Sequence, residues 1–196
     1  TYLALALARH LVGEDEASNQ QLVQFHPSYA YEDFFEGFRP FETAGGQPSF
    51  RIFPGPLRRI ASDARANPKR PFVLIIDEMN RANLAKVFGE LYFLLEYRDR
   101  SIQLQYSPAE AFRLPENLFI IGTMNTADRS IALLDAAMRR RFAFVELHPD
   151  EPPVQDVLAR FVAAQGAVGD QRAELLSALN AAIEDSDRDF KIGPSY

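Results

Sequence analysis

Two short apolar runs in this sequence end abruptly in side chains that can do chemistry. Residues 72–76 lead into Asp77 and Glu78, and residues 118–123 are followed closely by Asn125. Runs of this length, rich in β-branched and aromatic residues, are typical of strands buried on both faces of a parallel sheet. Ligands of open α/β sheets bind beyond the carboxyl ends of such strands. We therefore expect these three polar side chains to lie side by side at one edge of a sheet.

Paired carboxylates at the end of an apolar strand suit the hydrolysis of a nucleoside triphosphate. One carboxylate can hold Mg²⁺ through the waters of the ion, and the other can polarise the water that attacks the phosphate. Taken alone, Asp77 and Glu78 fit equally well a strand end that leaves two acids in solvent. The second strand, with its own polar tip at Asn125, favours the catalytic interpretation.

Three segments make the chain resemble the AAA+ NTPases of the McrB type, the motor subunits of 5-methylcytosine-specific restriction systems. They are residues 24–40, the Walker B block 77–83 with its continuation at 88–91, and residues 122–130 followed by 139–142. Together they span nearly the whole chain. The string Met-Asn-Thr-Ala-Asp-Arg-Ser at 124–130 is far more specific than a Walker B motif.

The resemblance implies a role for each polar residue at the sheet edge. The Thr1 hydroxyl would bind Mg²⁺, and Asp77 would hold the same ion through its waters. Glu78 would act as the general base, or would orient the attacking water. Asn125 stands at the sensor 1 position, where an amide can donate to a phosphate oxygen and accept from a neighbouring group.

The same resemblance assigns roles to residues that follow the second strand. Asp128 and Arg129 complete the family signature, although an Asp that caps a helix next to a solvated Arg is the simpler alternative. Arg139, Arg140 and Arg141 stand where AAA+ rings carry arginines that reach the γ-phosphate of the neighbouring subunit. Three consecutive arginines point in different directions, so at most two can face that site. The alternative is that these arginines are solvated and stand at the carboxyl end of a helix because the helix dipole stabilises cations there.

No Gly-x-x-x-x-Gly-Lys-Thr phosphate-binding loop occurs in the 196 residues. The chain begins with Thr1 and a helix-forming run at 2–11 that has no cap of its own. In the family, the helix after the P-loop begins with the Thr of Gly-Lys-Thr. We therefore interpret the chain as a fragment that begins at the last residue of Walker A and is inactive without the P-loop. A helix that simply starts at the terminus is the alternative.

Composition indicates a cytoplasmic domain. The chain has no cysteine, so neither a disulfide nor a thiolate metal site can form, and no apolar stretch is long enough to span a membrane. The net charge of −6 argues against a main role in gripping nucleic acid, which needs clustered Lys and Arg.

Strands and helices alternate along the sequence, which predicts an α/β fold. Strands are expected at 22–25, 118–123 and 143–147 besides the Walker B run, hairpins at 37–54 and 102–114, and helices at 2–12, 31–35, 57–67, 84–97, 131–139, 154–165 and 171–185. The strand that enters the P-loop would lie between 118–123 and 143–147, so those two strands should not pair directly. The prolines at 149–153 mark a boundary between an α/β core (1–149) and the beginning of an α-helical lid (150–196).

We therefore expect an AAA+ P-loop NTPase core that lacks its first strand and P-loop. The resemblance implies a Mg²⁺-dependent motor that hydrolyses GTP or ATP and drives DNA translocation and cleavage. It further implies a hexameric ring, a McrC-like nuclease subunit as partner, and a DNA-reading domain absent from this sequence. A MoxR-like or dynein-related ATPase that remodels protein complexes is the alternative. A non-catalytic AAA+ scaffold would have no chemical need for Glu78 and Asn125.

Overall fold

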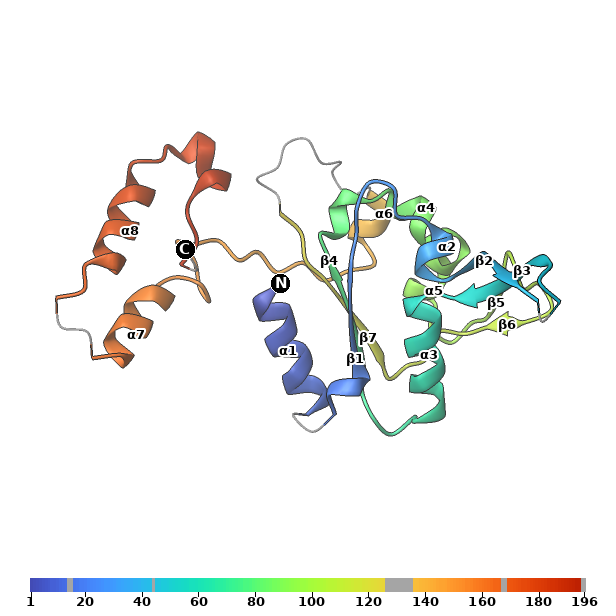
Figure 1. Cartoon of the computed structure of the whole chain (residues 1–196). Helices are drawn as coiled ribbons and strands as arrows, with labels where there is room; N and C mark the ends of the chain where they lie inside the picture. The colour runs from blue at the N-terminus through green and yellow to red at the C-terminus, as the bar shows by residue number, and fades with distance from the viewer. Residues whose placement is uncertain (14–15, 44, 126–135, 167–168, 195–196) are drawn as a thin grey trace. The chain divides into compact units, whose positions relative to one another are not determined.

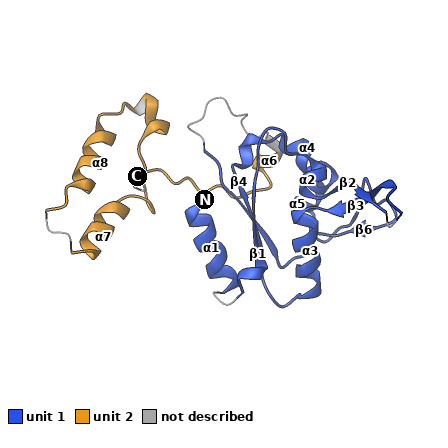
Figure 2. Cartoon of the chain, in the orientation of Figure 1, with its two compact units in different colours: residues 1–125, 130–136 blue, residues 126–129, 137–196 orange. Residues whose placement is uncertain are grey.

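The computed structural model describes residues 1–13, 16–43, 45–125, 136–166 and 169–194. The chain divides into two compact units, the first of residues 1–125 with 130–136 and the second of residues 126–129 with 137–196 (Figure 2). Within the described ranges, none of the helices is both long enough and apolar enough to cross a bilayer.

A three-stranded parallel sheet forms the core of the first unit. Its strands are β1 (Gln20–Gln24), β4 (Phe72–Asp77) and β7 (Leu118–Gly122), in the order β1-β4-β7. The central strand β4 is buried along Phe72–Ile76, as the continuous apolar run predicted. The parallel α/β fold class is therefore confirmed.

Helices cover both faces of this sheet, which is why its central strand is apolar from Phe72 to Ile76. Helix α1 (Tyr2–Val12) packs Ala4, Ala8 and Val12 against alternate residues of β4, namely Val73 and Ile75. Helix α3 (Pro56–Ala66) contacts all three strands from the other face (Figure 1).

The single helix expected over 84–97 is wrong, because it is interrupted at Gly89. The segment consists of α4 (Leu84–Phe88), a 3-10 turn (Gly89–Leu91) and α5 (Tyr92–Glu96). Gly89 has a positive φ of 49°, and a Cβ there would lie 3.2 Å from the ring of Tyr31, the first residue of α2 (Tyr31–Phe34). The chain breaks its helix where this aromatic side chain packs.

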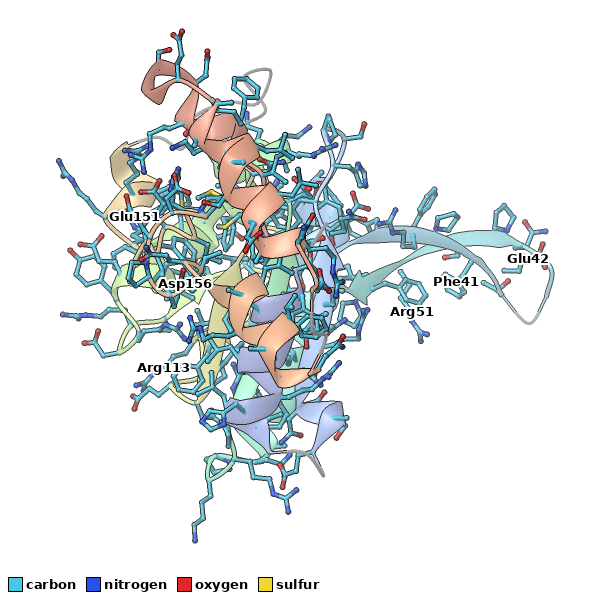
Figure 3. The ribbon with its side chains drawn as sticks, turned by 90° about the vertical axis from the view of Figure 1, so that its left-hand side faces the viewer. Phe41, Glu42, Arg51, Arg113, Glu151 and Asp156 are labelled. Atoms are coloured by element: carbon cyan, nitrogen blue, oxygen red, sulfur yellow. The ribbon has the colours of Figure 1, made fainter. Side chains whose placement is uncertain are left out.

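Two antiparallel ribbons complete the first unit. The hairpin expected over 37–54 is confirmed as β2 (Glu36–Glu42) paired with β3 (Pro48–Pro54), with Arg39 opposite Arg51. Figure 3 shows this ribbon extending outward, with Phe41 and Arg51 along it. The second hairpin is shorter than expected, with two residues in each strand, in β5 (Ile102–Gln103) and β6 (Ala111–Phe112).

The described part of the second unit contains helices and no strand. These elements are the end of α6 (Ala136–Arg139), α7 (Val157–Ala164), α8 (Arg172–Ala181) and a 3-10 segment (Asp185–Phe190). Helices α7 and α8 pack on each other, and the Asn180 side chain exchanges hydrogen bonds of 2.9 and 2.7 Å with the backbone of Ile192.

The strand expected over 143–147 is wrong, since this segment has no regular structure and exposes Phe144, Val145 and Leu147. A strand is held by hydrogen bonds to a neighbouring strand, and no described segment pairs with 143–147. Strand β7 likewise pairs only with β4 among the described residues. Of the helix expected at 131–139, residues 131–135 lie outside the described ranges.

Candidate functional site

The carboxylate of Asp77 is the centre of the polar cluster at the end of β4. The Thr1 hydroxyl donates a hydrogen bond of 2.5 Å to its Oδ1 atom, and the Thr123 hydroxyl donates one of 2.6 Å to the same atom. Thr1 immediately precedes α1 and Thr123 immediately follows β7, so three elements of the first unit meet at this carboxylate. No described residue donates a hydrogen bond to the other oxygen, Oδ2, which leaves that oxygen open to a ligand.

The surroundings of Asp77 favour its ionised form. Its side chain is only 14% exposed, and this burial alone would raise the pKa. The hydrogen bonds from Thr1 and Thr123, together with the charge of the Thr1 ammonium group, outweigh burial and hold the pKa of Asp77 below its usual value. An ionised carboxylate beside a threonine hydroxyl is an all-oxygen donor set, which suits Mg²⁺. No described group of three or more His, Cys, Asp or Glu side chains could bind a metal by itself, and Mg²⁺ commonly keeps several waters.

Glu78 follows the strand in a left-handed backbone conformation, with φ 53° and ψ 43°. Residues with a Cβ seldom adopt this conformation, and it concentrates at functional sites. The Glu78 amide donates to the Thr123 hydroxyl at 3.4 Å, and Arg81 Nε donates to Glu78 Oε2 at 3.1 Å. The turn therefore directs the second carboxylate away from the line of the strand, and Arg81 holds it.

The sequence predicts Thr123 only as the last residue of a strand, whereas in the structure its hydroxyl contacts the Asp77 carboxylate and the Glu78 amide. The parallel register could have revealed it, because Ile76 pairs with Gly122 and the next pair along is Asp77 with Thr123. Gly122 leaves room for the Met79 side chain, since a Cβ there would lie 2.5 Å from Met79 Sδ.

Asn125 lies at the same edge of the sheet, as expected. Its backbone oxygen accepts a hydrogen bond of 3.1 Å from Asn80 Nδ2, and its side chain is exposed. The structure thus joins Thr1 to Asp77 and places Asn125 against Asn80, in the turn that follows Glu78.

The other predicted site residues lie either outside the described ranges or in the second unit. Asp128 and Arg129 lie outside the described residues. Arg139 and Arg140 are exposed residues of the second unit, at the end of α6 and just beyond it.

A parallel sheet covered by helices on both faces, with Asp77 and Glu78 at the carboxyl end of its central strand and Thr1 hydrogen-bonded to Asp77, is typical of the P-loop NTPase class of α/β domain. Residues 1–142 match the family described as the AAA domain of the dynein-related subfamily, and the chain belongs to this family.

Two restriction proteins are similar to this chain. The type IV methyl-directed restriction enzyme EcoKMcrB subunit of Escherichia coli (strain K12) is 40% identical over 208 residues, which is 100% of this chain and 44% of that protein. The type II restriction enzyme BsuMI component YdiS of Bacillus subtilis (strain 168) is 30% identical, over 62% of this chain and 46% of that protein. The chain thus spans less than half the length of either relative. The resemblance to the McrB type is confirmed.

A more distant similarity joins the chain to a eukaryotic protein. Cortactin-binding protein 2 of Equus caballus is 28% identical over 98 residues, which is 48% of this chain and 6% of that protein.

Proposed function

We propose that this domain hydrolyses a nucleoside triphosphate, GTP or ATP, with Mg²⁺ as cofactor. The observation that carries the proposal is the convergence of the Thr1 and Thr123 hydroxyls on Asp77, with Glu78 held next to it in a left-handed turn. Hydrogen bonds from the protein hold both acids, and such preorganisation is what electrostatic catalysis requires.

Each side chain of the cluster has a distinct task in this proposal. Thr1 and Asp77 would hold Mg²⁺, which supplies charge neutralisation at the phosphates when it is bound. Glu78 accepts a proton from the attacking water or orients that water, while Arg81 limits the movement of its carboxylate. Asn125 provides an exposed amide that can bond to the γ-phosphate or to the water. Asp128 and Arg129 are proposed to complete the pocket.

The domain is further proposed to act in a ring, as a cytoplasmic motor of a restriction complex. Exposed arginines support the ring, because Arg139 or Arg140 could reach the nucleotide of a neighbouring subunit. The two relatives named as restriction enzymes support a McrB-like complex that translocates and cleaves DNA with a nuclease subunit. In this proposal residues 1–149 form the catalytic core and residues 150–196 begin a lid.

The family description favours a second candidate function. Residues 1–142 match a family that is described by its relation to dynein and not to restriction. A motor that remodels protein complexes would use the same acids and the same Mg²⁺, but its turnover would respond to a protein substrate instead of DNA and a nuclease.

The test is turnover by the protein that contains this chain, with GTP and ATP compared in Mg²⁺ and in EDTA. We expect phosphate release with at least one nucleotide in Mg²⁺ and none in EDTA. Stimulation by a nuclease partner would support the restriction motor. A protein that binds neither nucleotide and releases no phosphate would contradict the proposal.

A further inference from the structure

We infer that Thr123 is the positioning residue of this site, and that its hydroxyl sets Asp77 and Glu78 in one fixed arrangement. The inference rests on the proposed function, because it assigns a residue to the reaction proposed for these two acids. Thr123 itself would touch neither the nucleotide nor the attacking water.

The direction of each hydrogen bond at Thr123 follows from the groups involved. A hydroxyl has one proton to donate and two lone pairs that accept. The ionised Asp77 carboxylate can only accept, and the Glu78 backbone amide can only donate. The single Thr123 proton must therefore point at Asp77 Oδ1, at 2.6 Å, while a lone pair receives the Glu78 amide at 3.4 Å. One side chain thus contacts both Asp77 and Glu78, and a single orientation of its hydroxyl satisfies both hydrogen bonds.

The same residue also stabilises the left-handed turn at Glu78. Its hydroxyl receives the Glu78 amide, and its backbone oxygen receives the next amide, that of Met79, at 2.9 Å. In the opposite direction, the Thr123 amide donates to the Ile76 oxygen at 2.9 Å. Two successive amides meet one residue in this way with Glu78 at its positive φ of 53°. Without the hydroxyl, the first of these two contacts is lost and the turn is less restrained.

The backbone bonds of Thr123 separate its positioning role from its role in the fold. Substitutions of the side chain leave the bonds to Ile76 and Met79 available, so the pairing of β4 with β7 should persist. Valine matches threonine in shape but lacks the hydroxyl, whereas serine keeps the hydroxyl and loses only the methyl group. The Thr123→Val and Thr123→Ser pair therefore isolates the hydroxyl.

The experiment compares these two variants in the protein that contains this chain. For Thr123→Val we expect kcat to fall about 10- to 100-fold, the usual effect of removing a group that orients a metal-binding carboxylate. The Mg²⁺ concentration for half-maximal rate should rise, while KM for the nucleotide at saturating Mg²⁺ stays within about threefold. Thr123→Ser should restore most of the rate. As a matched control, Thr43→Val removes a hydroxyl from the β2–β3 turn and should leave turnover unchanged.

A second measurement needs no turnover and therefore judges the inference separately from the proposed function. Hydrogen–deuterium exchange should be faster in the peptide that contains residues 78 and 79 in Thr123→Val, and should match the wild type in Thr123→Ser. If the wild type hydrolyses neither nucleotide, the proposed function fails and the exchange result still decides the role of Thr123. The inference would be overturned if Thr123→Val had the same kcat, the same Mg²⁺ dependence and the same exchange rate as the wild type.

Discussion

Glu78 and Gly55 illustrate how single positions shape this domain through the backbone. Glu78 has a positive φ where three backbone amides hold the turn: the Glu78 amide donates to the Thr123 hydroxyl, the Met79 amide to the Thr123 oxygen, and the Thr123 amide to the Ile76 oxygen. Gly55 precedes α3 where two segments of backbone nearly touch, and its amide donates to the Phe35 oxygen at 2.5 Å. Space is the constraint at Gly55, since its φ of −76° is open to any residue.

Gly55→Ala should therefore destabilise the first unit. A Cβ at this position would lie 2.4 Å from the Phe34 backbone oxygen and 2.7 Å from the Phe35 nitrogen, which cannot rotate away as a flexible side chain would. Overpacking of this kind costs about 1–3 kcal/mol, which calorimetry or denaturant unfolding would detect. Gly45→Ala is the matched control, because a Cβ there meets nothing within 4 Å. Equal stability of the two variants would show that the backbone around Gly55 relaxes.

The residues of the site were predictable where a general rule places them. Asp77, Glu78 and Asn125 follow parallel strands, and the carboxyl ends of parallel strands share an edge. The role of Thr123 could not be predicted from the sequence. It depends on the register between β4 and β7, which the apolar pattern of either strand does not determine. The left-handed turn at Glu78 could not be predicted either, because glutamate is not among the residues that indicate a positive φ.

At the scale of elements, a buried ion pair fixes the base of the β2–β3 ribbon. Glu36, the first residue of β2, is fully buried and pairs with Arg58 of α3. Arg58 also pairs with Glu110, and the Ser107 hydroxyl donates to Glu36 Oε2 at 3.2 Å. The ribbon, α3 and the β5–β6 hairpin are thereby joined through one guanidinium.

Arg58→Ala should loosen this junction. Removing the cation leaves the Glu36 carboxylate buried without a counter-charge, and breaking a buried pair in this way costs about 3–5 kcal/mol. The double variant Glu36→Leu with Arg58→Met should recover much of the loss, because it removes both charges. Chemical denaturation measures each variant, with the exposed Lys69→Ala as control. An Arg58→Ala variant as stable as the wild type would mean that water solvates the Glu36 carboxylate.

Element predictions failed where long-range packing decides the outcome. The apolar positions of 84–97 fit one helix, yet the Tyr31 ring and Gly89 divide it, and Tyr31 lies far away in the sequence. Residues 143–147 have the composition of a strand, but composition cannot supply the neighbouring strand that would hold one in place. The β2–β3 hairpin succeeded because its two arms and the Gly45-Gly46 turn are close together in the sequence.

At the scale of the whole molecule, the proposed ring makes each active site a product of two subunits. Arg139→Ala and Arg140→Ala should each leave the subunit folded, and the variant that removes the inter-subunit arginine should abolish turnover. Mixing that variant with Glu78→Gln subunits should restore hydrolysis, since a neighbour supplies the missing arginine to an intact acid. Arginine fingers contribute about 10³–10⁵ in rate, so recovery is measurable by phosphate release. Mixed rings that stay inactive would show that the arginines do not act on the nucleotide of the neighbouring subunit.

Glu78→Gln tests most directly whether Glu78 activates water next to a metal-binding Asp77. Glutamine keeps the size of the side chain and an oxygen for Arg81, but it is a far weaker base. In the protein that contains this chain, we expect turnover to fall by at least about 100-fold, while nucleotide affinity in a binding titration stays within about threefold of the wild type. A parallel loss of affinity, or turnover that persists in Glu78→Gln, would contradict the account.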